Sequence, residues 1–318
     1  MRSIHHRDGH LGWDRTIPPI VRVASGEVVE LTLADCFDGQ LAVRATPGDV
    51  ATLDATRANP LTGPIHVEGA RPGDTLAVEV VELELGEVGW TAVIPGFGLL
   101  ADDFPDPHVV VSHLVPGGPT GTVEVGTLAR IPAAPFLGTV GLAPAAAGPH
   151  SVIPPRRVGG NLDGRLLTAG ATLLLPVEVE GALLSVGDPH ALQGDGEVCG
   201  TAVETTARAR LRVEVLRDAP VRGPVLRIPP RTGPDPRDGA AVVTTGVGPD
   251  LEGGAREATR AMVEQLVASH EGLAPVDAYV LCSVLGDLAI AEVVDAPNWV
   301  VTLRVPLGPI LLPQRRTR

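Results

Sequence analysis

The stretch Arg208–Leu216, RARLRVEVL, alternates charged and apolar residues along its length. Successive side chains of a β-strand point to opposite faces, so this pattern predicts a strand with one wet face and one buried face. The same alternation, or a short apolar run, recurs between Gly, Pro and Asp residues through the first two thirds of the chain. The predicted strands are Val28–Leu33, Thr75–Leu85, Trp90–Ile94, Gly121–Ile131, Thr172–Val179 and Thr206–Leu216.

Turn-forming residues separate these runs. The 318 residues include 38 glycines and 31 prolines, which follow no period and stand between apolar segments. Such punctuation is typical of many turns that join short strands, rather than of disorder. Only 3% of the residues are aromatic, so the core must be built from Val, Leu, Ile and Ala.

The last third of the chain has a different pattern. It follows Pro229–Asp238, a proline-rich segment that indicates a linker. Apolar residues at helical spacing then predict a helix from Asp250, its cap, to about Ser269. A second short helix and two strands are predicted over Pro275–Leu285, Leu288–Val294 and Val300–Val305. The fold class is therefore mainly β: a β-sandwich or barrel-like body, residues 1–228, that carries the active site, and a smaller α+β part, residues 229–318.

Charge and composition exclude several classes of partner. The net charge of −13 argues against nucleic acid, because phosphate backbones repel such a surface. No apolar run reaches the roughly 18 residues of a membrane span, and the polar first 14 residues contain no apolar signal core. Three widely spaced cysteines do not make a disulfide framework. We therefore expect a soluble protein of the reducing cytoplasm.

The chain contains no lysine. Mechanisms that use a lysine amine to activate Ser or Cys, namely the Ser–Ser–Lys and Cys–Glu–Lys types, are therefore excluded. A phosphate-binding P-loop, whose lysine reaches the terminal phosphates, is excluded for the same reason.

The most informative polar residues lie in Gly181–Glu204, GALLSVGDPHALQGDGEVCGTAVE. Asp188 and His190 are two residues apart at the end of an apolar run, so an extended chain would point both to one face. Carboxylate oxygen and imidazole nitrogen suit Zn²⁺ or a similar ion. Asp195 and Glu197 follow between glycines and would share a face in the same way. Four ionisable groups at the end of a buried strand need a partner, and a cation is the simplest one.

A structural alternative exists for each of these residues. Asp in a Gly-Asp turn often serves only the turn, but turn chemistry does not require His190 or Glu197. A second polar group is Asn161 and Asp163 in GGNLDG, where Asn161 could ligate a metal or stabilise an oxyanion, although this motif alone also fits a turn. Further candidates are Asp35 and Glu68, while His5, His6 and His10 are expected to belong to a mobile solvated terminus.

Several motifs together resemble the acetamidase/formamidase family over almost the whole chain, in order. They are Asp35-Cys36-Phe37 with Gln40, the run from Asn59 to Asp74, Phe136–Gly138 with Gly141–Pro144, Gly159–Asp163, Leu175–Glu204, Gly286–Leu288 and Val293–Asp295. The chain departs from the family pattern at Val158, where a histidine is common, and at His66, where an aromatic residue is common. Both could reshape the pocket.

The resemblance implies hydrolysis of a short aliphatic amide to a carboxylic acid and ammonia, a mostly β fold, and a homodimer or higher homo-oligomer. A metal ion would activate water and polarise the carbonyl group; Zn²⁺ is the ion expected, with Ca²⁺ as the alternative. In this hypothesis Asp188, His190 and Asp163 hold the ion, and Glu197 is the general base.

The other two roles are less closely defined. Asp195 would be a further ligand or would orient His190, and Asn161 would stabilise the oxyanion. The rival interpretations are a hydrolase of another linear or cyclic amide, and a non-catalytic homologue that only binds a small molecule.

Overall fold

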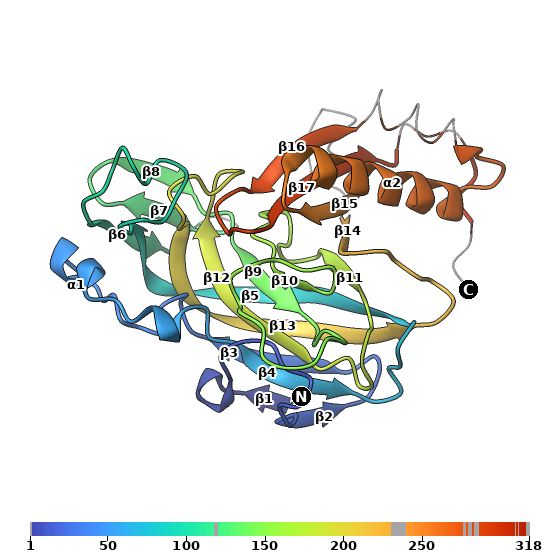
Figure 1. The fold of residues 1–318 in the computed structure, drawn as a ribbon, viewed down its shortest axis with the longest axis horizontal. Coiled ribbons are helices and arrows are strands. Elements are labelled where there is room, and N and C mark those ends of the chain that lie inside the picture. Colours follow the sequence, from blue (N-terminus) through green and yellow to red (C-terminus); the bar gives the residue numbers. More distant parts are fainter. Residues whose placement is uncertain are drawn as a thin grey trace.

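A computed structural model describes residues 2–117, 120–229, 240–275, 278, 282, 286–308, 310 and 312–315. The strands of these residues form one hydrogen-bonded network of 17 strands, which confirms the mainly β fold class. Figure 1 shows two long strands, β5 and β13, running through the middle of the molecule. Strands of the first half are β1 (Arg2–Ile4), β2 (Val21–Val23), β3 (Val28–Leu33), β4 (Thr62–Val67), β5 (Thr75–Val93), β6 (His108–Val115), β7 (Thr122–Val125), β8 (Ala129–Pro132) and β9 (Phe136–Gly141).

The remaining elements complete the body and the C-terminal part. The strands are β10 (Gly159–Asn161), β11 (Thr172–Pro176), β12 (Leu184–Leu192), β13 (Val203–Leu216), β14 (Val225–Ile228), β15 (Ala241–Gly248), β16 (Asp287–Glu292) and β17 (Trp299–Pro306). The helices are the short α1 (Pro47–Ala51), the longer α2 (Leu251–Ser269) and two 3₁₀ turns, η1 (His6–Asp8) and η2 (Ala55–Arg57).

The burial pattern of β13 confirms the strand that was predicted from alternating residues. Ala209, Leu211 and Val213 are fully buried in the main apolar core, whereas Arg208, Arg210 and Arg212 lie on the opposite face. The strand pairs antiparallel with β3 on one side and β5 on the other, so it forms the centre of the sheet.

Three strands were predicted with wrong boundaries. The segments Thr75–Leu85 and Trp90–Ile94 form one continuous strand, β5, because nearly its whole length pairs with β13. Gly89 allows this close pairing, since a Cβ there would lie 2.7 Å from the carbonyl oxygen of Glu204. The segment Gly121–Ile131 is instead the hairpin β7–β8.

The helix predicted from Asp250 is confirmed as α2. The Asp250 carboxylate caps it by accepting a hydrogen bond of 2.7 Å from the backbone N–H of Gly253. Its buried face, which includes Ala258, Met262 and Leu266, packs in an apolar cluster with Leu303 of β17. Figure 1 shows α2 at the top of the molecule, where it packs against β15 and β17. Among the described residues, no helix is long and apolar enough to cross a membrane.

Several expectations for the chain ends meet different outcomes. The first histidines are not all solvated, because Nε2 of His10 lies 2.9 Å from Oγ of Ser185, a buried residue of β12. Most of Pro229–Asp238 and of the second predicted helix, Pro275–Leu285, lies outside the described residues. Strand β14 pairs with β11 of the body and with β15, so hydrogen bonding continues across residue 228, the boundary predicted between the two parts.

Candidate active site

A group of carboxylates and one imidazole, called here the acidic cluster, lies buried where β12, β13, β10 and the end of β16 approach one another. Its members are Asp163, Asp188, His190, Glu197, Glu204 and Asp295, and each is at most 8% exposed. All of them except His190 line a cavity of about 260 Å³. Sequence positions more than a hundred residues apart therefore meet at one small hollow.

Strand register brings the central pair of the cluster together. His190 of β12 is directly opposite Glu204 of β13, and Nε2 of His190 lies 3.1 Å from Oε2 of Glu204. The same Nε2 atom lies 3.1 Å from Oδ1 of Asp188. Asp188 has a φ of 56°, a left-handed conformation that costs energy for a residue with a side chain. Both carboxylates thus converge on one ring nitrogen.

Gln193 fixes the tautomer of this imidazole. The Gln193 side-chain amide donates a hydrogen bond of 2.9 Å to the carbonyl oxygen of Asp163, so its Oε1 faces Nδ1 of His190 at 2.9 Å. An oxygen there accepts the Nδ1 proton, which leaves the lone pair of Nε2 on the side of Asp188 and Glu204. In neutral His190, three acceptor atoms therefore point toward one another.

Those three acceptor atoms lack hydrogen-bond partners. Oδ1 of Asp188, Nε2 of His190 and Oε2 of Glu204 are buried without any hydrogen bond of acceptable geometry, and so is Oδ1 of Asp163. A buried acceptor that is neither hydrogen-bonded nor paired with a cation costs free energy. The arrangement needs positive charge, supplied either by a proton on Nε2 or by a bound cation.

The electrostatics of the cluster show the same need. Burial raises the pKa of Asp163, Glu197 and Asp295 well above the usual carboxyl range, because each loses water and faces other carboxylates. Burial alone would lower the pKa of His190, but the charges of Glu204 and Asp188 outweigh it and raise that pKa well above 6.5. Within the described residues, the salt bridges to this cluster come from His190 alone.

Two sets of donor atoms could hold a metal ion. One is Cys36, Asp188 and Glu204; the other is Asp163, His190 and Glu197; within each set the donor atoms lie within 4.8 Å of one another. In a tetrahedral zinc site with bonds of about 2.0 Å, neighbouring ligand atoms are about 3.3 Å apart. Nε2 of His190 lies 3.1 Å from a carboxylate oxygen of Asp188 and 3.1 Å from one of Glu204. These distances are close to the zinc value, so these three residues fit such an ion.

Asn161 has a fixed orientation at the cavity wall. Its Oδ1 accepts hydrogen bonds from Nδ2 of Asn59, at 3.1 Å, and from the Thr139 hydroxyl group. Its Nδ2 donates to the carboxylate of Asp295. Because an amide nitrogen carries two protons, one N–H remains available to a ligand in the cavity.

Glycine at position 138 leaves room for two carboxylates. A Cβ on Gly138 would lie 2.5 Å from Oδ1 of Asp163 and 2.7 Å from Oδ2 of Asp188. Real Cβ atoms do not approach oxygen so closely, so only glycine permits both side chains to occupy their positions. Strand β9 therefore shapes the site without contributing a side chain at this point.

Three sequence candidates neither belong to the acidic cluster nor line its cavity. The expectation that Asp195 shares a face with Glu197 is wrong, because Gly196 and Glu197 have positive φ values of 98° and 46° and the chain is not extended there. The Asp195 side chain is 37% exposed and pairs with Arg165 at 2.8 Å. Glu68 is exposed in the turn after β4. Asp35 is buried, but its carboxylate accepts backbone N–H groups of Phe37 and Gly39.

Four residues of the site were not among the sequence candidates. Glu204 stood at the end of the quoted motif, directly after Val203, and Asp295 was the last residue of the Val293–Asp295 motif. Cys36 neighbours the candidate Asp35 and lines the cavity. Only Gln193 gave no signal, since its role depends on contacts with His190 and with a distant backbone carbonyl group.

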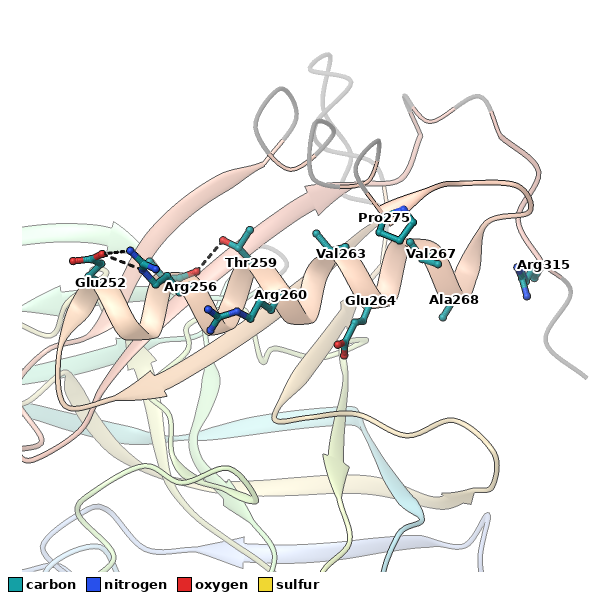
Figure 2. Close-up of a pocket in the computed structure, with 11 residues that line it drawn as sticks. Glu252, Arg256, Thr259, Arg260, Val263, Glu264, Val267, Ala268, Pro275 and Arg315 are labelled. Atoms are coloured by element: carbon teal, nitrogen blue, oxygen red, sulfur yellow. Dashed lines mark hydrogen bonds and ion pairs between the residues drawn. The ribbon is translucent and has the colours of Figure 1, made fainter.

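A larger hollow, of about 1030 Å³, lies along the outer face of α2 (Figure 2). No His, Cys or Asp side chain is among the described residues that line it. Its charged residues are partly paired within the helix, as the ion pair of Glu252 with Arg256 in Figure 2 shows. The buried carboxylates lie at the smaller cavity.

The chain is similar to known proteins in both sequence and fold. The family model of the Acetamidase/Formamidase family matches residues 2–152 and 145–310. The chain belongs to this family. It is 30% identical to an acetamidase of Mycolicibacterium smegmatis over 270 residues, 66% of each protein. A formamidase of Methylophilus methylotrophus is 28% identical over 379 aligned residues, which cover 96% of this chain and 88% of the formamidase.

A solved structure shows the same fold. The crystal structure of an acetamidase from Bacillus halodurans superposes with a TM-score of 0.85 at 31% identity, covering 96% of this chain and 97% of the other. Together with the family match, this makes the chain a hydrolase of the amide C–N bond.

Proposed function

We propose that this family member hydrolyses small linear amides, of which acetamide and formamide are the simplest, with the help of a divalent cation. The observation that carries the proposal is the convergence of three partnerless acceptors, on Asp188, His190 and Glu204, at the edge of a cavity. A carboxylic acid and ammonia would be the products.

The same three residues would hold the cation, with Cys36 and Asp163 close enough to add a ligand. Imidazole nitrogen and a nearby thiol favour Zn²⁺ over Ca²⁺, which prefers oxygen ligands only. When bound, the ion would polarise the amide carbonyl group and lower the pKa of water.

Glu197 is the proposed general base. Burial raises its pKa, so this carboxyl group holds a proton more readily than an exposed glutamate does. It would accept a proton from the attacking water and deliver it to the departing ammonia. The left-handed backbone at Glu197 turns its side chain into the cavity, whereas the neighbouring Asp195 remains outside.

Asn161 is the proposed oxyanion donor. Its Oδ1 is held by two hydrogen bonds, so its free N–H is already oriented and loses little freedom when the tetrahedral oxyanion forms. Asp195 has no proposed contact with the metal ion or the substrate. It could affect Glu197 only through the loop that contains both residues.

The experiment is an assay of ammonia release from formamide, acetamide and propionamide by the wild-type protein and the Glu197→Gln variant. We expect turnover by the wild type, and a loss of about 100- to 10,000-fold in kcat for the variant. Asp195→Asn is the matched control and should keep most of the activity. A wild-type protein that releases no ammonia would support a non-catalytic homologue instead.

Homo-oligomer formation and a cytoplasmic location remain predictions from the sequence. Light scattering of the purified protein would measure the first.

A further inference from the structure

Two chemically different groups of residues line the cavity. The first group is polar: the five carboxylates of the acidic cluster together with Asn59, Asn161 and Thr201. The second group, called here the apolar wall, comes from four separate segments: the turn after β3, the η2 turn, the end of β5 and the loop before β10. Its lining side chains are Phe37, Ala55, Ala58, Ile94, Phe97 and Ile153.

Aromatic residues are concentrated at this site. The chain has only four phenylalanines. Phe37 and Phe97 line the cavity, and the ring of Phe136 packs edge-on against His190 with centroids 4.9 Å apart. Both lining rings are only partly buried, so a ligand in the cavity would cover apolar surface that water now contacts. This wall is suited to an apolar group.

The wall is also preorganised. The backbone N–H of Phe97 donates to the carbonyl oxygen of Ile94 at 3.0 Å, which closes a tight turn after β5. The ring lies against Gly200, where a Cβ would come within 2.5 Å of Cδ1 of Phe97. The N–H of Leu99 donates to Val198 at 2.9 Å, so this segment is tied to the loop of Glu197. Binding would require little reordering of the pocket.

The cavity is larger than acetamide requires. At about 30 Å³ per water molecule, the four heavy atoms of acetamide occupy about the space of three waters, roughly 90 Å³. A cation and one water would take up about 60 Å³ more on the same scale. The cavity of about 260 Å³ therefore leaves space beside the apolar wall. That space would hold about four or five further carbon atoms.

We infer that the apolar wall binds the acyl group of the substrate, and that the preferred amides carry a branched or aromatic acyl group of about four to seven carbons. This inference rests on the proposed amide hydrolysis and names the substrate class of the same site. The carbonyl carbon would lie at the acidic cluster, and the hydrocarbon part would contact Phe97 and Ile153.

The first test measures kcat/KM for formamide, acetamide, isobutyramide and benzamide. Each buried methylene group should raise kcat/KM about fourfold, so isobutyramide should exceed acetamide by about tenfold or more. Values that are equal, or that fall with acyl size, would overturn the inference and leave the proposed function intact. Absence of ammonia from all four amides would overturn both. Faster cleavage of acetanilide than of benzamide would place the amine substituent at the apolar wall and contradict the assignment to the acyl group.

The second test compares two phenylalanine variants. Phe97→Ala should lower the isobutyramide-to-acetamide ratio of kcat/KM by about tenfold, because it removes contacts made only by the larger acyl group. Phe104→Ala is the matched control, since that ring is 59% exposed in the same connection and does not line the cavity. Ile153→Ala tests the wall from another segment if Phe97→Ala fails to fold. An unchanged ratio in the wall variants, or an equal fall in Phe104→Ala, would contradict the inference.

Discussion

Two groups of carboxylates in this molecule differ in how their charge is balanced. On the outer face of β13, Arg208, Arg210 and Arg212 lie opposite glutamates of β5 and β3, and every pair is partly exposed. In the acidic cluster, five carboxyl groups that are each at most 8% exposed have a single imidazole among them. The outer group is complete within the chain, whereas the inner group requires a cation or protons from outside it.

The difference shows which acidic residues are informative about function. A surface ion pair contributes only about 0–1 kcal/mol to stability, so the face of β13 needs no functional explanation. Buried carboxylates without an arginine cost free energy unless a ligand compensates. Such a cost at the wall of a cavity points to a binding or catalytic site.

The largest effect should come from removing a proposed ligand. Asp188→Asn keeps the side-chain shape but removes one of the two negative charges that lie 3.1 Å from Nε2 of His190. We expect amide hydrolysis to fall by more than about 100-fold and the metal content to fall with it, since even residues beyond the ligand shell change affinity by about 10- to 100-fold. Elemental analysis and an ammonia assay on the same preparation measure both. Full activity with full metal content would remove Asp188 from the site.

A smaller effect should follow from displacing the carboxylates without removing one. Gly138→Ala places a methyl group against Asp163 and Asp188, so we expect a loss of about 10- to 100-fold in kcat/KM from misplaced groups. Gly164→Ala is the matched control, because the only atom within 4 Å of its Cβ would be the carbonyl oxygen of Leu162, at 4.0 Å. Equal losses in both variants would mean that Gly138 has no particular role in shaping the site.

Glu292 provides a test of stability rather than of activity. It is fully buried beside Asp295, and burial raises its pKa to about 7. The folded state thus binds the proton more tightly than the unfolded state, so the stabilisation present below pH 4.5 is lost as pH rises through 7. We expect Glu292→Gln to match the wild type at pH 4.5 and to be more stable by roughly 2–3 kcal/mol at pH 8. Denaturant unfolding at the two pH values measures this, and an identical difference at both would contradict the assigned pKa.

The smallest effect should come from the outer group. Arg210→Ala removes contacts to Glu30 and Glu82, and we expect a change of about 1 kcal/mol or less in unfolding free energy. Amide hydrolysis should stay within about twofold of the wild type, because the side chain is on the face opposite the core. A large loss of activity would show that the two groups are coupled.

The sequence predicted the strands whose pattern is local. The alternation in β13 and the capped apolar stripe of α2 each depend on neighbouring residues, and both are confirmed. Two predicted strands are one strand, β5, because that strand pairs with β13. A local sequence pattern contains no information about such pairing. The sequence also predicted that residues of two separate motifs come together. The structure brings together Asp163 of the first motif and Asp188, His190 and Glu197 of the second.

The prediction from the sequence was wrong where the backbone is not in an extended conformation. Asp195 and Glu197 were expected on one face because an extended chain was assumed, whereas positive φ values separate them. Gln193 acts through a hydrogen bond to a backbone carbonyl group thirty residues away, which spacing cannot reveal.

Metal content measured together with activity tests the central claim most directly. The purified protein should contain about one or more equivalents of a divalent ion per chain, most of it zinc. Treatment with a chelator should abolish amide hydrolysis, and added Zn²⁺ should restore it. If protein stripped to below about 0.1 equivalents kept its full rate, the acidic cluster would have to be balanced by protons alone and the account of metal-assisted hydrolysis would be contradicted.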